Sequence, residues 1–187
     1  MGVTFQDRLP VDWQVLPSVP GDPELRNFSD SNTRLLQAFN LLDEQPGEPE
    51  EGVDGESPEN RRLEAKLDFL MAMLGELLAA QVGVPAPRPV VVGATHLRIV
   101  DPGRSGPPVP SVGECLVLRL FLDARFPKPL QFPCVVCEPE PSTGDGLVVR
   151  LLGVSEPLQA ELEKLVFRHH RRAVASTRRH GKLPEPR

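Results

Sequence analysis

Apolar residues in the segment 59–84 repeat with the period of one helix face. The leucines are separated alternately by four and three residues: Leu63, Leu67, Leu70, Leu74 and Leu77. This spacing is the a/d stripe of a helix that packs against another helix. Three flanking residues widen the stripe: Met71, Met73 and Leu78. Because a wide stripe suits contact with several neighbours, we predict an oligomerisation helix that favours four copies over two. The alternative is an amphipathic helix that lies on its own domain.

From residue 88 onward the apolar period changes to two, which is typical of strands. Five short runs have this pattern: 88–93, 95–100, 114–123, 130–138 and 146–152. Clusters of proline and glycine separate them, and no long helical run intervenes. We therefore predict an antiparallel sheet or small barrel rather than a parallel sheet. Pro133, inside the fourth run, predicts a sheet edge or a bulge.

Two further helices are predicted on either side of these segments. Apolar residues spaced three and four apart predict a helix over 31–42, with Ser29 or Ser31 as its N-cap. The last helix begins at Ser155 as N-cap and carries Pro157 in its first turn. Gly181 is a natural terminator for it.

The remaining segments lack a clear period. Residues 1–27 contain four prolines and are predicted to be a Pro-rich extended arm, a candidate for disorder. Residues 43–59 hold eight acids and no base, which predicts an extended acidic linker. The expected organisation follows in chain order: an arm at 1–27, a short helix and linker at 28–58, the leucine helix at 59–84, a barrel with its C-terminal helix at 85–182, and a tail at 183–187.

Composition narrows the classes of function. Only nine residues are aromatic, which argues against a stacking platform for single-stranded nucleic acid. Three cysteines are an odd, low count that fits a reducing cytosol better than a disulfide framework. The sequence has no apolar run long enough for a membrane span, and its first twenty residues do not have the pattern of a secretory signal.

The net charge of −5 hides a strong asymmetry. The segment 164–187 carries eight basic residues and one acid, a net charge of +7, and the rest of the chain carries −12. This polarity suggests a basic interaction face, with three candidate anion contacts: Arg168, Arg171 and Arg172. The alternative is a solvated helix end whose cations suit the helix dipole.

No pattern of residues predicts catalysis or a metal site. Cys134 and Cys137 form half of a zinc motif, but three residues apart on a strand they face opposite sides. His169 and His170 point about 100° apart on a helix and do not easily share one metal. Neither a Gly-x-Ser-x-Gly elbow nor a P-loop is present. We expect no enzyme activity, no metal and no cofactor.

The order of these elements resembles the PilZ family, and most closely its atypical, tetramer-forming branch. The resemblance is carried by four stretches: RRLEAKLDFLMAMLGELLA at 61–79, RPVVVGATHLRIV at 88–100, GECLVLRLFLD at 113–123 and GVSEPLQAELEKLVFRHHRR at 153–172. It implies an α+β fold with a small antiparallel six-stranded β-barrel and long flanking helices. It also implies a cytoplasmic adaptor in bacterial cyclic di-GMP signalling, acting in motility, type IV pili and virulence. Its expected partners are other copies of the chain and signalling or pilus-related proteins.

The ligand motifs of that family are absent. Members that bind cyclic di-GMP carry Arg-x-x-x-Arg before the barrel and (Asp/Asn)-x-Ser-x-x-Gly on it. Here the second motif falls on Val91, Gly93 and His96, which depart at all three positions. The pair Arg168 and Arg172 has the spacing of the first motif but follows the strands. We therefore expect no cyclic di-GMP at the usual site. The alternative function is an anion- or nucleic-acid-binding module that uses the basic C-terminal helix.

Overall fold

The computed structural model describes residues 3–43, 58–102, 107–123, 128–139 and 146–180. Most of the predicted acidic linker, Gly181 and the tail at 183–187 lie outside these residues. Six strands and three helices follow one another along the chain: β1 (Thr4–Val15), α1 (Asp22–Asp43), α2 (Pro58–Val82), β2 (Pro87–Gly93), β3 (His96–Ile99), β4 (Cys115–Leu120), β5 (Leu130–Cys137), β6 (Leu147–Leu151) and α3 (Glu156–His180). None of the described helices is both long and apolar enough to cross a membrane.

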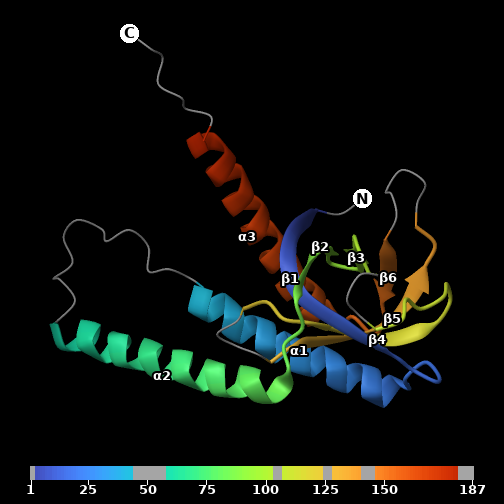
Figure 1. Cartoon of the computed structure of the whole chain (residues 1–187), viewed down its shortest axis with the longest axis horizontal. Coiled ribbons are helices and arrows are strands. Elements are labelled where there is room, and N and C mark those ends of the chain that lie inside the picture. Colours follow the sequence, from blue (N-terminus) through green and yellow to red (C-terminus); the bar gives the residue numbers. More distant parts are fainter. Residues whose placement is uncertain (1–2, 44–57, 103–106, 124–127, 140–145, 181–187) are drawn as a thin grey trace, which may run out of the picture.

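The six strands form a closed antiparallel barrel in the order β1-β2-β3-β6-β5-β4 (Figure 1). The five strands predicted from residue 88 onward are present as β2 to β6. Alternate side chains of every strand point inward and make a core without tyrosine, in which leucine and valine predominate. The predicted α+β fold with a six-stranded barrel is confirmed.

The sixth strand is β1, and the prediction of an arm over 1–27 is wrong. The first half of β1 pairs with β2, and its second half pairs with β4, which closes the barrel. Four of its side chains are buried: Phe5, Leu9, Val11 and Trp13. Pro10 is tolerated because it lies where the strand changes partner. It faces Pro87 at the last position of the β1–β2 ladder, and its carbonyl accepts a hydrogen bond from the Phe121 N–H.

Pro133 lies neither at an edge nor in a bulge, because β5 is paired on both sides in the closed barrel. Its carbonyl accepts a hydrogen bond from the Leu152 N–H, one residue beyond the end of β6 (N···O 2.8 Å). The missing N–H therefore falls where the β5–β6 ladder ends. A bulge occurs elsewhere: Gly113, with φ +88°, and Glu114 both hydrogen-bond to Val136.

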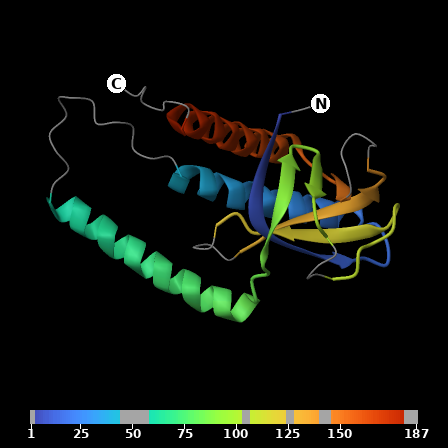
Figure 2. The same ribbon diagram turned by 45° about the horizontal axis from the view of Figure 1, so that its top comes forward.

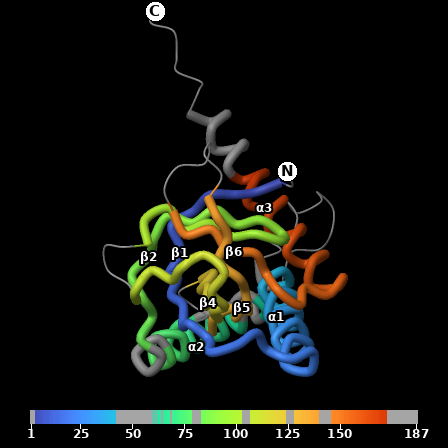
Figure 3. Tube along the Cα trace, turned by 90° about the vertical axis from the view of Figure 1, so that its right-hand side faces the viewer, coloured from blue at the N-terminus to red at the C-terminus, as the bar shows by residue number. Residues whose placement is uncertain are grey.

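Helices α1 and α3 pack on each other and lie on one side of the barrel (Figure 3). α1 follows β5, where the amide of Asn32 donates to the Gln131 carbonyl and accepts from the Gln131 N–H, at 2.8 and 2.9 Å. α3 covers β1 and β2. Gly153 lets α1 approach closely, because a Cβ there would lie 2.7 Å from the Leu25 Cβ.

The sequence predicted the start of α3 correctly but not the start of α1. Ser155 caps α3 as predicted, with its Oγ accepting from the Leu158 N–H at 3.4 Å. α1 begins nine residues earlier than predicted, at Asp22, because the Glu24 carboxylate accepts from the Gly21 N–H. Ser29 is consequently not a cap but a buried residue within α1, hydrogen-bonded to Ser155.

Helix α2 stands apart from the rest of the molecule, as Figure 2 shows. It covers most of the predicted leucine segment and ends at Val82, just before Gly83, whose φ is +65°. A short proline-containing connector then leads to β2. Within the described residues α2 packs against no other helix or strand. The described structure therefore does not bear out the alternative of a helix that lies on its own domain.

Candidate functional site

The leucine face of α2 is open to solvent. We define it as the five leucines of the stripe, and each has between 51 and 64 % of its surface exposed: Leu63, Leu67, Leu70, Leu74 and Leu77. Met73 and Leu78 beside them are also exposed, and Met71 is half-buried. More than half of the large apolar side chains that are exposed in the described residues belong to this one helix. Soluble monomers rarely leave such a continuous apolar surface in water.

The heptad positions of the apolar residues indicate how many other helices could pack against the leucine face. With the leucines at positions a and d, Met71 and Leu78 fall at e, and Met73 falls at g. Two-stranded coiled coils usually carry charged residues at e and g, whereas apolar residues there extend the contact to two flanking helices. The C-terminal half of α2 therefore has the pattern of a helix in a bundle.

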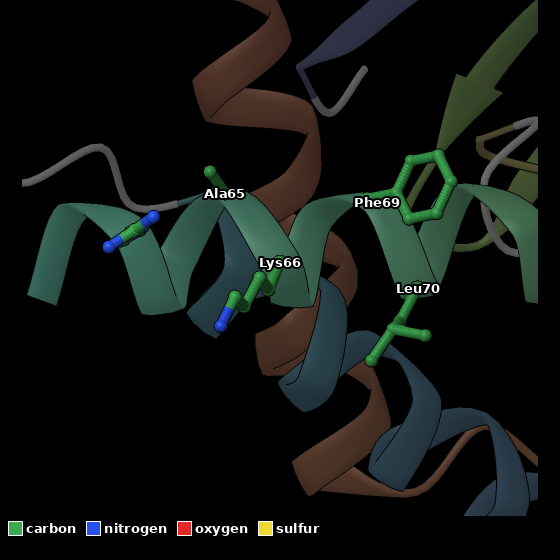
Figure 4. A pocket seen from close by; sticks show the side chains of 5 residues that line it. Ala65, Lys66, Phe69 and Leu70 are labelled. Carbon is green, nitrogen blue, oxygen red and sulfur yellow. The ribbon is translucent and has the colours of Figure 1, made fainter. Parts of the chain in front are cut away.

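A shallow hollow on the surface of α2 also favours contact with another molecule. It is lined by five residues of this helix: Arg62, Ala65, Lys66, Phe69 and Leu70. In Figure 4, Phe69 and Leu70 project from different sides of the helix. No second described element contributes to the lining. Only a surface from outside the described chain could close it.

The β2–β3 hairpin brings the three degenerate motif positions together. Gly93 ends β2 and His96 begins β3, with two residues between them. Val91 is half-buried in β2 between Gln6 of β1 and Arg98 of β3. None of the three supplies an acid, an amide or a hydroxyl. The hairpin is therefore present without the polar groups that the resemblance associates with guanine recognition.

The backbone at Gly93 leaves little room for a side chain. A Cβ there would lie 3.2 Å from the His96 carbonyl oxygen and 3.3 Å from the Thr4 Cγ2. The serine of the family motif would have to be accommodated against these atoms. On the opposite strand His96 is exposed, and its Nδ1 lies 2.9 Å from the Thr95 Oγ1. In the alignment that the resemblance implies, this imidazole falls at the glycine position of the family motif.

The arginine at the start of β2 has a structural role. Arg88 is buried, and its guanidinium donates to the Pro102 carbonyl at 2.9 Å. It also lies 5.6 Å from the centre of the Trp13 ring. Trp13 in turn donates from Nε1 to the Pro108 carbonyl at 3.0 Å. Arg88 thus ties β1 and β2 to the segment before β4 and is not presented to a ligand.

The cations of α3 fall into two groups. On the inner side, Arg168 donates to the Oδ1 of Asn40 on α1. Further along the helix, Arg171 and Arg172 are exposed. The three candidate anion contacts are therefore not equivalent, because the structure already engages Arg168 within the chain.

Asn40 joins Arg168 to a buried carboxylate. Its Nδ2 donates to Glu161 Oε2 at 2.5 Å, and the Lys164 ammonium lies 2.8 Å from Glu161 Oε1. The hydrogen bond from Lys164 lowers the pKa of Glu161, against the opposing effect of burial. Sequence reasoning missed this cluster between α1 and α3. Its signal was Asn40, a polar residue four positions after buried Leu36 on the apolar face of a predicted helix.

The two cysteines of the half zinc motif lie on opposite faces of β5, as their spacing predicts. Cys134 is fully buried inside the barrel, and burial raises the pKa of its thiol to about 12. Cys137 is half-buried on the outer face. Across the part of the chain that the structure describes, no group of three His, Cys, Asp or Glu side chains could hold a metal ion.

Comparisons with known proteins agree with this architecture. Residues 36–179 match the family model described as "Atypical PilZ domain, cyclic di-GMP receptor". No curated protein sequence matches the chain. A crystal structure of a pathogenic protein from Xanthomonas campestris, a tetrameric PilZ domain self-assembled through an unusual helical bundle, has a similar fold. The two are 21 % identical with a TM-score of 0.65, over 92 % of this chain and 90 % of that one. The chain belongs to the atypical PilZ domain family.

Proposed function

We propose that the protein is a non-enzymatic PilZ adaptor that assembles through α2 and does not bind cyclic di-GMP at the usual motif. The family model that it matches is described as a cyclic di-GMP receptor, which supports a role in that signalling class. In the cell it acts in bacterial cyclic di-GMP pathways, where the resemblance implies roles in motility, pili and virulence. Its partners there are signalling or pilus-related proteins in the cytoplasm.

The exposed leucine face carries this proposal. Burying one leucine contributes about 1.5–3 kcal/mol, so several on one helix provide a strong drive to associate. In proteins most of the stability of a helix comes from the packing of its apolar face. α2 has no packing partner among the described elements of its own chain. Other copies of α2 supply both the missing cover and the missing stability.

Four copies fit the helix better than two. A two-stranded seam covers the a and d positions but leaves Met71, Met73 and Leu78 at e and g in water. A four-helix bundle covers these residues as well. The similar Xanthomonas campestris protein is described as a tetramer that self-assembles through a helical bundle. That description is consistent with the same mode of assembly here.

The assembly is tested by placing charge in the seam. We expect Leu70→Asp combined with Leu74→Asp to convert the tetramer into a monomer, because two carboxylates per helix cannot be buried in an apolar seam. Multi-angle light scattering at tens of micromolar measures the mass. The cooperative thermal transition of the barrel should persist, since α2 does not contact it.

Ala72→Asp is the matched control for this experiment. Ala72 is an exposed residue of α2 on the side opposite the leucine face, so its substitution adds charge without entering the seam. It should retain the mass of the wild type. A monomeric wild type, or a double variant with unchanged mass, would contradict assembly through the leucine face.

The ligand proposal is tested by calorimetry. We expect no heat of binding when micromolar cyclic di-GMP is titrated into the protein. Each charge-assisted hydrogen bond that the usual site can no longer make weakens binding by about 1.5–3 kcal/mol, and several together amount to more than four decades in affinity. A PilZ protein with both motifs intact serves as the positive control. Sub-micromolar binding by this chain would overturn the proposal.

If binding does occur, one further variant locates it. Arg168→Ala with Arg172→Ala removes the only pair in the sequence that has arginine spacing like the first family motif. Loss of binding in this variant would assign the ligand to α3. Unchanged binding would assign it to the β2–β3 hairpin.

A further inference from the structure

The outer face of α3 carries an exposed phenylalanine with a histidine and an arginine beside it. We define the Phe167 surface as Phe167, His170 and Arg171, which are spaced three and four apart and all exposed or half-exposed. Phe167 has 57 % of its surface in water. The Arg171 guanidinium lies 5.9 Å from the centre of its ring. Among the described residues neither His170 nor Arg171 has a hydrogen bond or ion pair.

The inner and outer cations of α3 differ in their partners. Lys164 pairs with the Glu161 carboxylate, and Arg168 is bonded to Asn40. The contact of Arg168 crosses from α3 to α1, whereas that of Lys164 lies within α3. The Arg171 guanidinium instead lies over the Phe167 ring, and its fork of donors can bond to an acceptor from outside.

The surroundings favour an acidic partner. The segment 164–187 has a net charge of +7, whereas the rest of the chain has −12. Approaching carboxylates are therefore attracted to this end of α3 and repelled from the remainder of the molecule. Figure 1 shows α3 extending beyond the barrel, so a partner can reach its outer face.

The exposed ring favours a protein over a nucleic acid. A long polyanion would extend from α3 across the negatively charged remainder of the chain. A short segment of protein can place its carboxylates against the basic residues of α3 alone and an apolar side chain against Phe167. Aromatic and arginine side chains together are typical anchors of protein interfaces.

We propose that the Phe167 surface docks an acidic segment of a partner protein that carries an apolar anchor residue. The anchor packs against Phe167, and carboxylates of the segment accept from the Arg171 guanidinium and from His170 when its ring carries a donor toward them. This surface does not overlap the leucine face of α2. Docking is thus independent of the assembly proposed above.

Fluorescence anisotropy tests the docking surface. The probe is a fluorescein-labelled helical peptide with glutamates on one side and leucines on the other, titrated with the full-length protein. We expect saturable binding that Phe167→Ser and Arg171→Glu each weaken about tenfold. Phe167→Leu keeps an apolar anchor and should weaken binding by at most about threefold.

Arg34→Glu is the matched control for charge. Arg34 is an exposed arginine of α1, so its reversal changes the net charge equally without touching the Phe167 surface. It should leave affinity for the peptide within about twofold of the wild type. Circular dichroism and the solution mass of every variant establish that the fold and the assembly are retained.

Three results would overturn the proposal. One is no saturable binding of the acidic peptide to the wild type. Another is an equal loss of affinity in Arg34→Glu, which would mean that the peptide responds to net charge alone. The third is tighter binding of a 20-nucleotide single strand of DNA with a steep dependence on salt, which would assign the surface to nucleic acid.

Discussion

At the scale of single residues, the polar cluster between α1 and α3 explains why these helices pack in one register. Asn40 is the bridge: it accepts from Arg168 and donates to Glu161, so one amide links a cation and a carboxylate on α3 to α1. A shift of either helix by one turn would leave Glu161 buried with fewer partners. Buried polar groups without partners cost more than the bonds they replace.

We predict that Glu161→Gln destabilises the fold by about 1–3 kcal/mol at neutral pH, because it removes charge from two hydrogen bonds in a buried site. The lowered pKa of Glu161 sets the pH dependence. A carboxyl whose pKa is depressed by folding stabilises the native state above its unfolded pKa, and this contribution is lost as the pH falls through the folded pKa. The difference between wild type and variant should therefore shrink in acid, as measured by urea unfolding.

Glu163→Gln provides the comparison for this substitution. Glu163 is exposed two residues away, where its carboxylate accepts from the Gln159 amide at 2.9 Å. Its replacement should change the free energy of unfolding by less than about 0.5 kcal/mol at any pH. Equal effects of the two substitutions would show that the cluster around Asn40 does not hold α1 to α3.

At the scale of elements, the spacing of apolar residues predicts those helices and strands that are determined by interactions between neighbours in the sequence. Three features could be predicted because residues close in the sequence determine them: the leucine spacing of α2, the cap at Ser155 and the alternation in β2 to β6. The two predicted strands 88–93 and 95–100 are separated by a tight turn. Val91, Gly93 and His96 were therefore expected on one hairpin. α2 also stands away from the barrel in the described residues.

β1 was missed because its evidence is not local. Its alternation is interrupted at Asp7, an exposed acid, and two prolines lie within or just after it. What makes this segment a strand is pairing with β2 and β4, which lie about eighty or more residues further along the chain. The contact between Asn40 and Arg168 was hidden for the same reason, since α1 and α3 are packed by the fold rather than by sequence proximity.

At the scale of the whole molecule, the chain divides into a closed unit and a projecting helix. The barrel with α1 and α3 is closed: its strands pair without a free edge, and no described buried polar side-chain atom lacks a hydrogen bond. α2 belongs to neither the core nor its cover. We therefore expect β1 to be essential to the fold and α2 to be dispensable to it.

Two alterations of the chain separate these roles. Removing residues 1–20 deletes β1 and takes four buried side chains from the core, each worth about 1.5–3 kcal/mol, which is comparable with the whole net stability of a domain. We expect that chain to lack a cooperative thermal transition.

Replacing residues 44–84 by a Gly/Ser linker of equal length removes α2 but none of the contacts of the barrel. That protein should unfold cooperatively, near the temperature of the wild-type barrel, and light scattering should show a monomer. A cooperative transition without β1, or its loss without α2, would contradict this division of the molecule.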